Sequence, residues 1–221
     1  MIDLRRDGDV HILRFDAGEN RFGPDFLDAV EGALDSLEGA EGPGALVTTG
    51  TGKFYSNGLD LDWLGANEDK FEPYLERVHG LYARLLSLPL PTVAAVNGHA
   101  FAGGGMLVLA HDFAVMRDDR GYFCLPEVDL GMSFTPGMSA LIQARLTAPV
   151  AHEAMITGRR YTAAQALDAG FVQRTAPEDG VLPAALELAA SLAPKQGKSV
   201  GRIRAGMYGP ALAALRGPAL G

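Results

Sequence analysis

The chain has 221 residues, of which 48% are hydrophobic, so its length allows one domain with a sizeable core. Its 19 Lys and Arg residues against 27 Asp and Glu residues give a net charge of −8, which argues against nucleic acid or an anionic membrane as the main partner. The single cysteine, Cys124, excludes an internal disulfide and a cysteine-based zinc site.

The N-terminal segment has no apolar signal core, and no apolar run approaches the roughly 18 residues of a membrane span. We therefore expect a cytoplasmic protein. The histidines show no metal-ligand spacing, so no metal site is expected, and there is no G-x-S-x-G nucleophile elbow.

Apolar runs and helical periodicity alternate along the chain. Strands are expected at 10–15, 45–49, 92–96 and 113–116, an extended piece at 122–125, and amphipathic helices at 26–37 and 71–86. Beyond Pro136 the sequence is mostly helical, with helices expected at 138–146, 150–156, 162–169 and 186–193. This alternation predicts an α/β arrangement with largely parallel sheets.

The most informative stretch runs from Thr92 to Gly131. Its apolar first run stops at an Asn-Gly turn, and three glycines, Gly103 to Gly105, then precede an apolar segment that fits the first turns of a buried helix. The free N–H groups at a helix N-terminus can stabilise an anion, although glycines can also serve close packing alone. Nucleotide-binding glycine motifs are absent, so an oxyanion site remains.

Four segments in this order resemble the crotonase, or enoyl-CoA hydratase/isomerase, family. They are FYSNGLDL at 54–61, AVNGHAFAGGG at 95–105, LPEVDLG at 125–131, and TGRRYTAAQA with its continuation at 157–172. The resemblance implies an α/β crotonase (ClpP-like) spiral of ββα units over 1–135. It also implies a helical C-terminal region over 136–221 that serves oligomerisation and is not an independent domain.

Further implications of the resemblance concern the ligand and its site. The substrate would be an acyl-CoA, with coenzyme A as part of the substrate and no separate cofactor, and the protein would form a homotrimer or hexamer. The backbone N–H groups of Asn57 and Gly104 would bind the thioester oxygen, each contributing roughly 3–4 kcal/mol to an enolate. The expected substrate-binding residues are Phe54, Ser56, Gly58, Asp60, Leu61 and Leu107.

Family hydratases use two glutamates, and here the first position looks like Leu107 while Glu127 keeps the second. A single carboxylate can still take a proton from C2 of a 3-enoyl-CoA and return it to C4. The resemblance is therefore greatest to Δ3,Δ2-enoyl-CoA isomerases, with Glu127 catalytic. Dienoyl-CoA isomerases carry an aspartate where this chain has Thr135, so that activity is disfavoured.

Alternatives stay open at this point. They are a hydratase, another crotonase reaction such as that of a thioesterase or decarboxylase, and a non-catalytic acyl-CoA-binding or RNA-binding relative. Trp63 either lines the acyl pocket or packs in the core, and Asp129 and Glu153 are expected to be structural. The region after Ala193 is glycine-rich, so its cover of the acyl pocket is expected to be reduced. Its candidates for contacts with CoA phosphates are Lys195, Lys198, Arg202 and Arg204.

Overall fold

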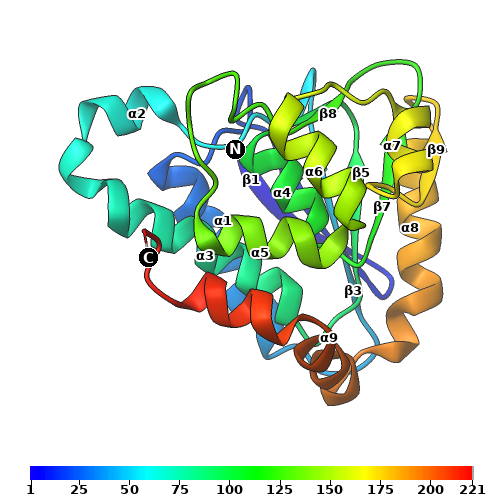
Figure 1. Ribbon diagram of the computed structural model, residues 1–221. Helices are drawn as coiled ribbons and strands as arrows, with labels where there is room; N and C mark the ends of the chain where they lie inside the picture. The colour runs from blue at the N-terminus through cyan, green and yellow to red at the C-terminus, as the bar shows by residue number, and fades with distance from the viewer. Residues whose placement is uncertain (221) are drawn as a thin grey trace.

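A computed structural model describes residues 1–220, and its main feature is a six-stranded sheet (Figure 1). The strand order is β1-β2-β3-β5-β7-β9, and only the β1–β2 pair is antiparallel. The strands are β1 (Ile2–Asp7), β2 (Val10–Phe15), β3 (Ala45–Gly50), β5 (Thr92–Val96), β7 (Phe113–Arg117) and β9 (Arg174–Ala176). Every residue of β3 and β5 is buried, as expected of inner parallel strands covered on both faces.

A second, smaller sheet has three parallel strands in the order β4-β6-β8, namely β4 (Phe54–Ser56), β6 (His99–Phe101) and β8 (Phe123–Cys124). Each turn of the chain places one strand in the large sheet and the next in the small sheet: β3 then β4, β5 then β6, β7 then β8. This repetition is the expected ββα spiral. It brings the ends of β4, β6 and β8 side by side, where the sequence has its loop, glycine and Pro-Glu segments.

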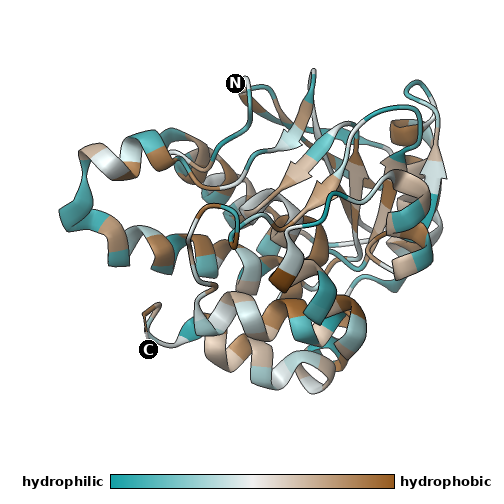
Figure 2. Cartoon of the chain, turned by 45° about the horizontal axis from the view of Figure 1, so that its top comes forward, coloured by the Kyte–Doolittle hydropathy of each residue, from teal (hydrophilic) through white to brown (hydrophobic). Residues whose placement is uncertain are grey.

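Helices cover both faces of the large sheet. One face packs against α1 (Pro24–Glu38), α3 (Phe71–Ser87) and the short buried α4 (Gly103–Leu109), and α8 (Val181–Leu192) lies along the other face over β3, β5 and β7. Figure 2 shows apolar residues, in tan and brown, in the central strands and in bands along the helices, and teal polar residues in the outer turns. α2 (Leu61–Ala66), the 3-10 turn Glu68–Lys70 and the start of α3 project from the body (Figure 1).

The C-terminal part is α5 (Pro136–Arg145), α6 (Ala148–Thr157), α7 (Ala163–Ala169), the 3-10 turn Ala193–Lys195 and α9 (Lys198–Arg216). Thr162 caps α7 in a capping box and Gly170 ends it, as expected. α9 packs against α3 and α5 (Figure 1). Within the expected helical region 136–221, β9 pairs with β7 and α8 covers the sheet, so this region shares the core of the spiral.

Arg204 anchors α9 from a buried position, 4% exposed. Its guanidinium donates to the Asp112 carboxylate and to the carbonyl oxygens of Leu88 and Leu90. Arg204 is therefore committed to the fold, and the expectation that it contacts CoA phosphates is wrong. Within residues 1–220, no helix combines the length and apolar character needed to cross a bilayer.

Candidate active site

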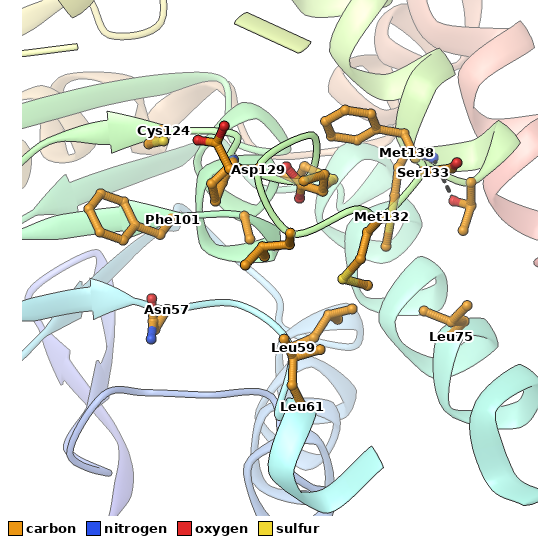
Figure 3. A pocket seen from close by; sticks show the side chains of 18 of the residues that line it. Asn57, Leu59, Leu61, Leu75, Phe101, Cys124, Asp129, Met132, Ser133 and Met138 are labelled. Atoms are coloured by element: carbon orange, nitrogen blue, oxygen red, sulfur yellow. Dashed lines mark hydrogen bonds between the residues drawn. The ribbon is translucent and has the colours of Figure 1, made fainter. Parts of the chain in front are cut away.

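A cavity of about 780 Å³ opens between the ends of the small sheet, the α2–α3 lobe and the segment that follows β8. Figure 3 shows Asn57, Phe101 and Cys124 at one end of this cavity and Leu75 and Met138 at the other. Most of its wall is apolar, formed by Leu59, Leu61, Phe71, Leu75, Phe101, Met106, Leu130, Met132, Phe134 and Met138. The cavity suits an elongated, largely apolar ligand.

Glu127 is the buried carboxylate of this cavity. It lies in the turn after β8, where its backbone carbonyl accepts the N–H groups of Leu130 (3.1 Å) and Met132 (2.9 Å). The residue is 6% exposed, and its Oε2 has no hydrogen-bond partner within the described residues. Burial raises the pKa of Glu127 from 4.5 to about 7. The group can therefore both accept and release a proton near neutral pH.

The other two acidic residues that line the cavity are exposed. Asp129 lies two residues after Glu127 in the same turn and is exposed. Asp62 is at the cavity mouth, where its carboxylate accepts a hydrogen bond from Arg21 at 2.5 Å. Neither is buried as Glu127 is. One carboxylate is thus placed for proton transfer inside the cavity.

The glycine run forms the N-terminal turn of α4, as expected. The helix begins at Gly103, after Ala102 in an unusual backbone conformation with φ of 49°. A Cβ atom on Gly104 would overlap the carbonyl oxygen of Ser56, so only glycine fits there. Within residues 1–220, the N–H groups of Gly103 and Gly104 have no protein acceptor, whereas that of Gly105 donates to Ala102 (2.9 Å). These free donors lie beside the cavity wall at Ala102 and Gly103.

The donor expected at Asn57 needs correction. Its backbone N–H donates to the carbonyl oxygen of Glu19 at 3.0 Å, and the next N–H, of Gly58, donates to Ser56 Oγ at 3.1 Å. The N–H of Leu59 follows and has no acceptor within residues 1–220. Because this loop pairs with residues 19–22, the first backbone N–H of the loop without an acceptor within residues 1–220 is that of Leu59, which lines the cavity.

Two of the expected substrate-binding residues hold the fold instead. Ser56 is fully buried, and its Oγ donates to the carbonyl of Asn20 at 2.7 Å. Leu107 is 1% exposed in the core and is not part of the cavity wall. Met106 lines the cavity instead, because successive residues of a helix point about 100° apart.

Among the other expected contacts, Leu61 lines the cavity, whereas Phe54, Gly58 and Asp60 lie outside its wall. Asp60 caps α2 by accepting the N–H of Trp63 at 3.2 Å, and Gly58 takes a φ of 78° at the turn. Phe54 packs on the His99 ring, with centroids 5.3 Å apart.

Trp63 and Glu153 also have structural contacts. Trp63 packs against Tyr74, with ring centroids 5.4 Å apart, so the packing alternative for Trp63 holds. Glu153 binds the hydroxyl of Tyr161 at 2.7 Å and Arg159 at 2.9 Å, as expected of a structural residue.

Sequence reasoning did not find several wall residues. Met132 and Phe134 come from the loop after Glu127, and Ala219 and Leu220 come from the C-terminal tail. Met132 and Phe134 could have been predicted as cavity residues, because they are apolar and lie in the loop directly after the candidate catalytic residue. No local pattern marks the second pair. The C-terminal region thus reaches the cavity, although it was expected to be reduced.

The chain is similar to known proteins of one family. The family described as "Enoyl-CoA hydratase/isomerase" matches residues 9–211. The "Enoyl-CoA delta isomerase 2, peroxisomal" of Arabidopsis thaliana is 36% identical over 94% of this chain and 92% of its own length. The chain therefore belongs to the enoyl-CoA hydratase/isomerase, or crotonase, family.

Solved structures show the same fold. A probable enoyl-CoA hydratase from Mycobacterium tuberculosis superposes with a TM-score of 0.91 at 29% identity, covering 97% of this chain and 91% of that one. A human mitochondrial delta3-delta2-enoyl-CoA isomerase has a TM-score of 0.90 at 24% identity, over 97% and 85% of the two chains, and is similar in fold. The predicted family and fold are confirmed, and the family implies an acyl-CoA ligand.

Proposed function

We propose that this protein is a Δ3,Δ2-enoyl-CoA isomerase that converts a 3-enoyl-CoA to the trans-2-enoyl-CoA. The observation that carries the proposal is the single buried carboxylate, Glu127, with a pKa raised to about 7 in a largely apolar cavity. The similarity to an Arabidopsis protein named enoyl-CoA delta isomerase supports it. A hydratase of this family would need a second carboxylate, and the residue at that position is Leu107.

In the proposed reaction the Glu127 carboxylate takes a proton from C2. The C2–H electron pair moves toward the thioester carbonyl and gives a dienolate, and the protonated Glu127 then returns the proton to C4. The double bond shifts from C3–C4 to C2–C3, with no net gain or loss of protons. The apolar side chains that line the same cavity, among them Met106 and Phe134, limit the access of water to the dienolate.

We further propose that the thioester oxygen binds between the N–H groups of Gly104 and Leu59. Both lack a protein acceptor within residues 1–220, and they come from the two segments that meet where the Ser56 carbonyl touches Gly104. Donors fixed before the reaction stabilise a developing oxyanion by roughly 3–4 kcal/mol each. This assignment replaces Asn57 with Leu59.

The polar end of the substrate would leave the cavity beside Phe101. There the Arg160 guanidinium lies 5.6 Å from the centre of the Phe101 ring and lines the cavity. Arg160 has no acidic partner within the described residues, so its charge is available to a CoA phosphate.

The test is incubation of the purified protein with trans-3-hexenoyl-CoA, followed by the absorbance of the conjugated 2-enoyl thioester. Glu127→Gln should lower kcat by about 10²–10⁴-fold, because general acid–base catalysis is lost. Asp129→Asn is the matched control, since it alters a cavity carboxylate that is exposed, and its kcat should stay within about threefold. The hydratase alternative is tested with trans-2-hexenoyl-CoA, because a hydratase adds water across C2=C3 and gives the 3-hydroxyacyl-CoA. Binding of both thioesters without conversion of either would indicate a non-catalytic protein.

The proposed assembly rests on the family. We propose a homotrimer, or a hexamer made of two trimers, in the cytoplasm. Ile203 and Met207 on α9 are 61% and 63% exposed, which suits burial by a second copy. Light scattering on the purified protein would give the mass of the assembly, and a fluorescent fusion would give the compartment.

A further inference from the structure

Three buried polar side chains form a line of hydrogen bonds behind the site. The hydroxyls of Tyr55 and Thr48 are 2.7 Å apart, Thr48 Oγ1 is 2.9 Å from His111 Nε2, and His111 Nδ1 is 2.8 Å from the carbonyl oxygen of Leu107. Each of the three side chains is 1% exposed or less. The line joins β4, β3 and the C-terminal end of α4.

The direction of proton donation along this line is fixed. A carbonyl oxygen only accepts, so His111 Nδ1 carries a hydrogen and donates it to Leu107. Burial lowers the pKa of His111 to about 4, so the ring is neutral and Nε2 accepts. The Thr48 hydroxyl then donates to Nε2, and the Tyr55 hydroxyl donates to Thr48. Loss of one hydroxyl would leave buried polar groups without partners.

The helix α4 needs support of this kind. It has seven residues, begins with three glycines and has no side-chain N-cap. Helices this short are unstable alone, and each glycine costs about 1 kcal/mol relative to alanine. Contacts with neighbouring elements must therefore hold α4 in place. His111 lies two residues after α4, binds the Leu107 carbonyl through Nδ1 and binds Thr48 on β3 through Nε2, so it links the helix to the large sheet.

The other end of the line reaches the second donor segment. Tyr55 immediately precedes Ser56, whose carbonyl contacts Gly104, and the same loop continues to Leu59. Thr48 on β3 lies between the two segments and is bonded to both. The distance between the N–H groups of Gly104 and Leu59 therefore depends on the relative position of α4 and β4. An oxyanion site tolerates errors of only about 0.5 Å.

We propose that His111, Thr48 and Tyr55 are positioning residues that hold α4 against β4 and thereby keep the two oxyanion donors at their working separation. This proposal rests on the proposed oxyanion site. The three residues do not line the cavity and do not touch the substrate. They act on transition-state stabilisation and not on acyl binding.

The test uses the isosteric change Thr48→Val, with Thr48→Ser as the conservative rescue. Thr49→Val is the matched control, because Thr49 is the next residue of β3, is 5% exposed, and its hydroxyl donates to the Ala95 carbonyl at 3.1 Å outside this line. Thr48→Val should lower kcat by about tenfold or more, with KM within about twofold. Thr48→Ser and Thr49→Val should keep kcat within about threefold.

A second measurement reports the oxyanion site directly. The infrared stretch of a ¹³C-labelled thioester carbonyl in a bound, unreactive acyl-CoA moves to lower frequency when the donors are well placed. Thr48→Val should move this band back toward its value in water, and Thr49→Val should not. Tyr55→Phe removes only the terminal hydroxyl and should give a smaller change of the same sign, which tests the proposal even if Thr48→Val fails to fold.

The outcomes separate this proposal from the proposed function. An unchanged band in both Thr48→Val and Tyr55→Phe, or an equal loss of kcat in Thr48→Val and Thr49→Val, would overturn the positioning role. A wild-type protein that shifts the band but does not isomerise 3-hexenoyl-CoA would overturn the isomerase function, while loss of that shift in Thr48→Val would still support the positioning role.

Discussion

The buried Glu127 carboxylate should make the protein less stable as the pH rises. Its native pKa of about 7 exceeds the ordinary value of 4.5, so the native state binds the proton more tightly than the unfolded chain. Stability from this group is complete below about pH 4.5 and is lost as the pH rises through about 7. Between about pH 5 and about pH 8 the loss is about 2.5 kcal/mol, at about 1.4 kcal/mol per pKa unit.

The Glu127→Gln variant isolates this effect. The amide has nearly the shape of the carboxyl group but does not ionise, so any change in packing is the same at both pH values. Free energies of unfolding are measured by urea denaturation of both proteins, at one protein concentration, at about pH 5 and about pH 8. The free energy of unfolding of the variant minus that of the wild type should be about 2.5 kcal/mol larger at about pH 8 than at about pH 5.

The other ionisable groups are common to both proteins and cancel in this double difference. A difference in unfolding free energy between Glu127→Gln and the wild type that is equal at the two pH values, within about 0.5 kcal/mol, would contradict the raised pKa of Glu127. A difference that is larger at low pH would mean that Glu127 is stabilised as the anion. Either result would remove the physical basis for proton transfer by this group.

Three other changes have expected outcomes. In the pH profile, kcat/KM should rise about tenfold per unit up to about pH 7 and then level off, because Glu127 acts first as a base; a flat profile would contradict this. Gly104→Ala should abolish folding or activity, because its Cβ would overlap the Ser56 carbonyl. Gly105→Ala should keep activity, because its Cβ would meet only side-chain atoms at 3.1 Å and 3.2 Å and a carbonyl at 3.4 Å. Activity in both variants or in neither would refute the steric argument. Arg204→Met should lower the free energy of unfolding by about 3–5 kcal/mol, because it removes the cation that pairs with Asp112. The exposed Arg202→Ala should lower it by less than about 0.5 kcal/mol, and thermal or urea unfolding measures both.

The long elements of the fold could be predicted from sequence because their periodicity reflects burial. The expected helix at 26–37 is α1 (Pro24–Glu38), and the one at 71–86 is α3 (Phe71–Ser87). The strands β4 and β6 have three residues each, too short for a pattern of alternation. Such strands form because their neighbours in the spiral supply the hydrogen bonds.

The 19-residue helix α9 is the largest element that sequence reasoning missed. Its glycines and Pro210 lower its helix propensity, and Tyr208 has a non-helical backbone where the helix kinks. Tertiary contacts override the local preference: Arg204 anchors the helix to Leu88, Leu90 and Asp112, and α9 packs along α3 and α5. Those contacts join residues more than ninety positions apart, which no local pattern reveals.

The residues of the candidate site also fall into those that a local motif predicts and those that depend on contacts between distant segments. Glu127 and Gly104 could be placed from motif order, because each depends on its own short segment. The proposed second donor, Leu59, could not be placed in this way, because the N–H of Asn57 is occupied by its hydrogen bond to the carbonyl oxygen of Glu19, 38 residues earlier. The motif therefore identifies the loop at 54–61, but the N–H group that is free to bind an oxyanion is set by hydrogen bonds that form only in the folded chain.

The stability cost and the proposed chemistry have one cause. The apolar wall around Glu127 raises the free energy of its anion, which weakens the native state above about pH 7 and makes the same anion a stronger base toward a C2 proton. Position 107 holds a leucine that is buried outside the cavity wall, so it brings no second carboxylate close to Glu127. One buried acid in a largely apolar cavity is the arrangement on which the proposed transfer of a proton within the substrate depends.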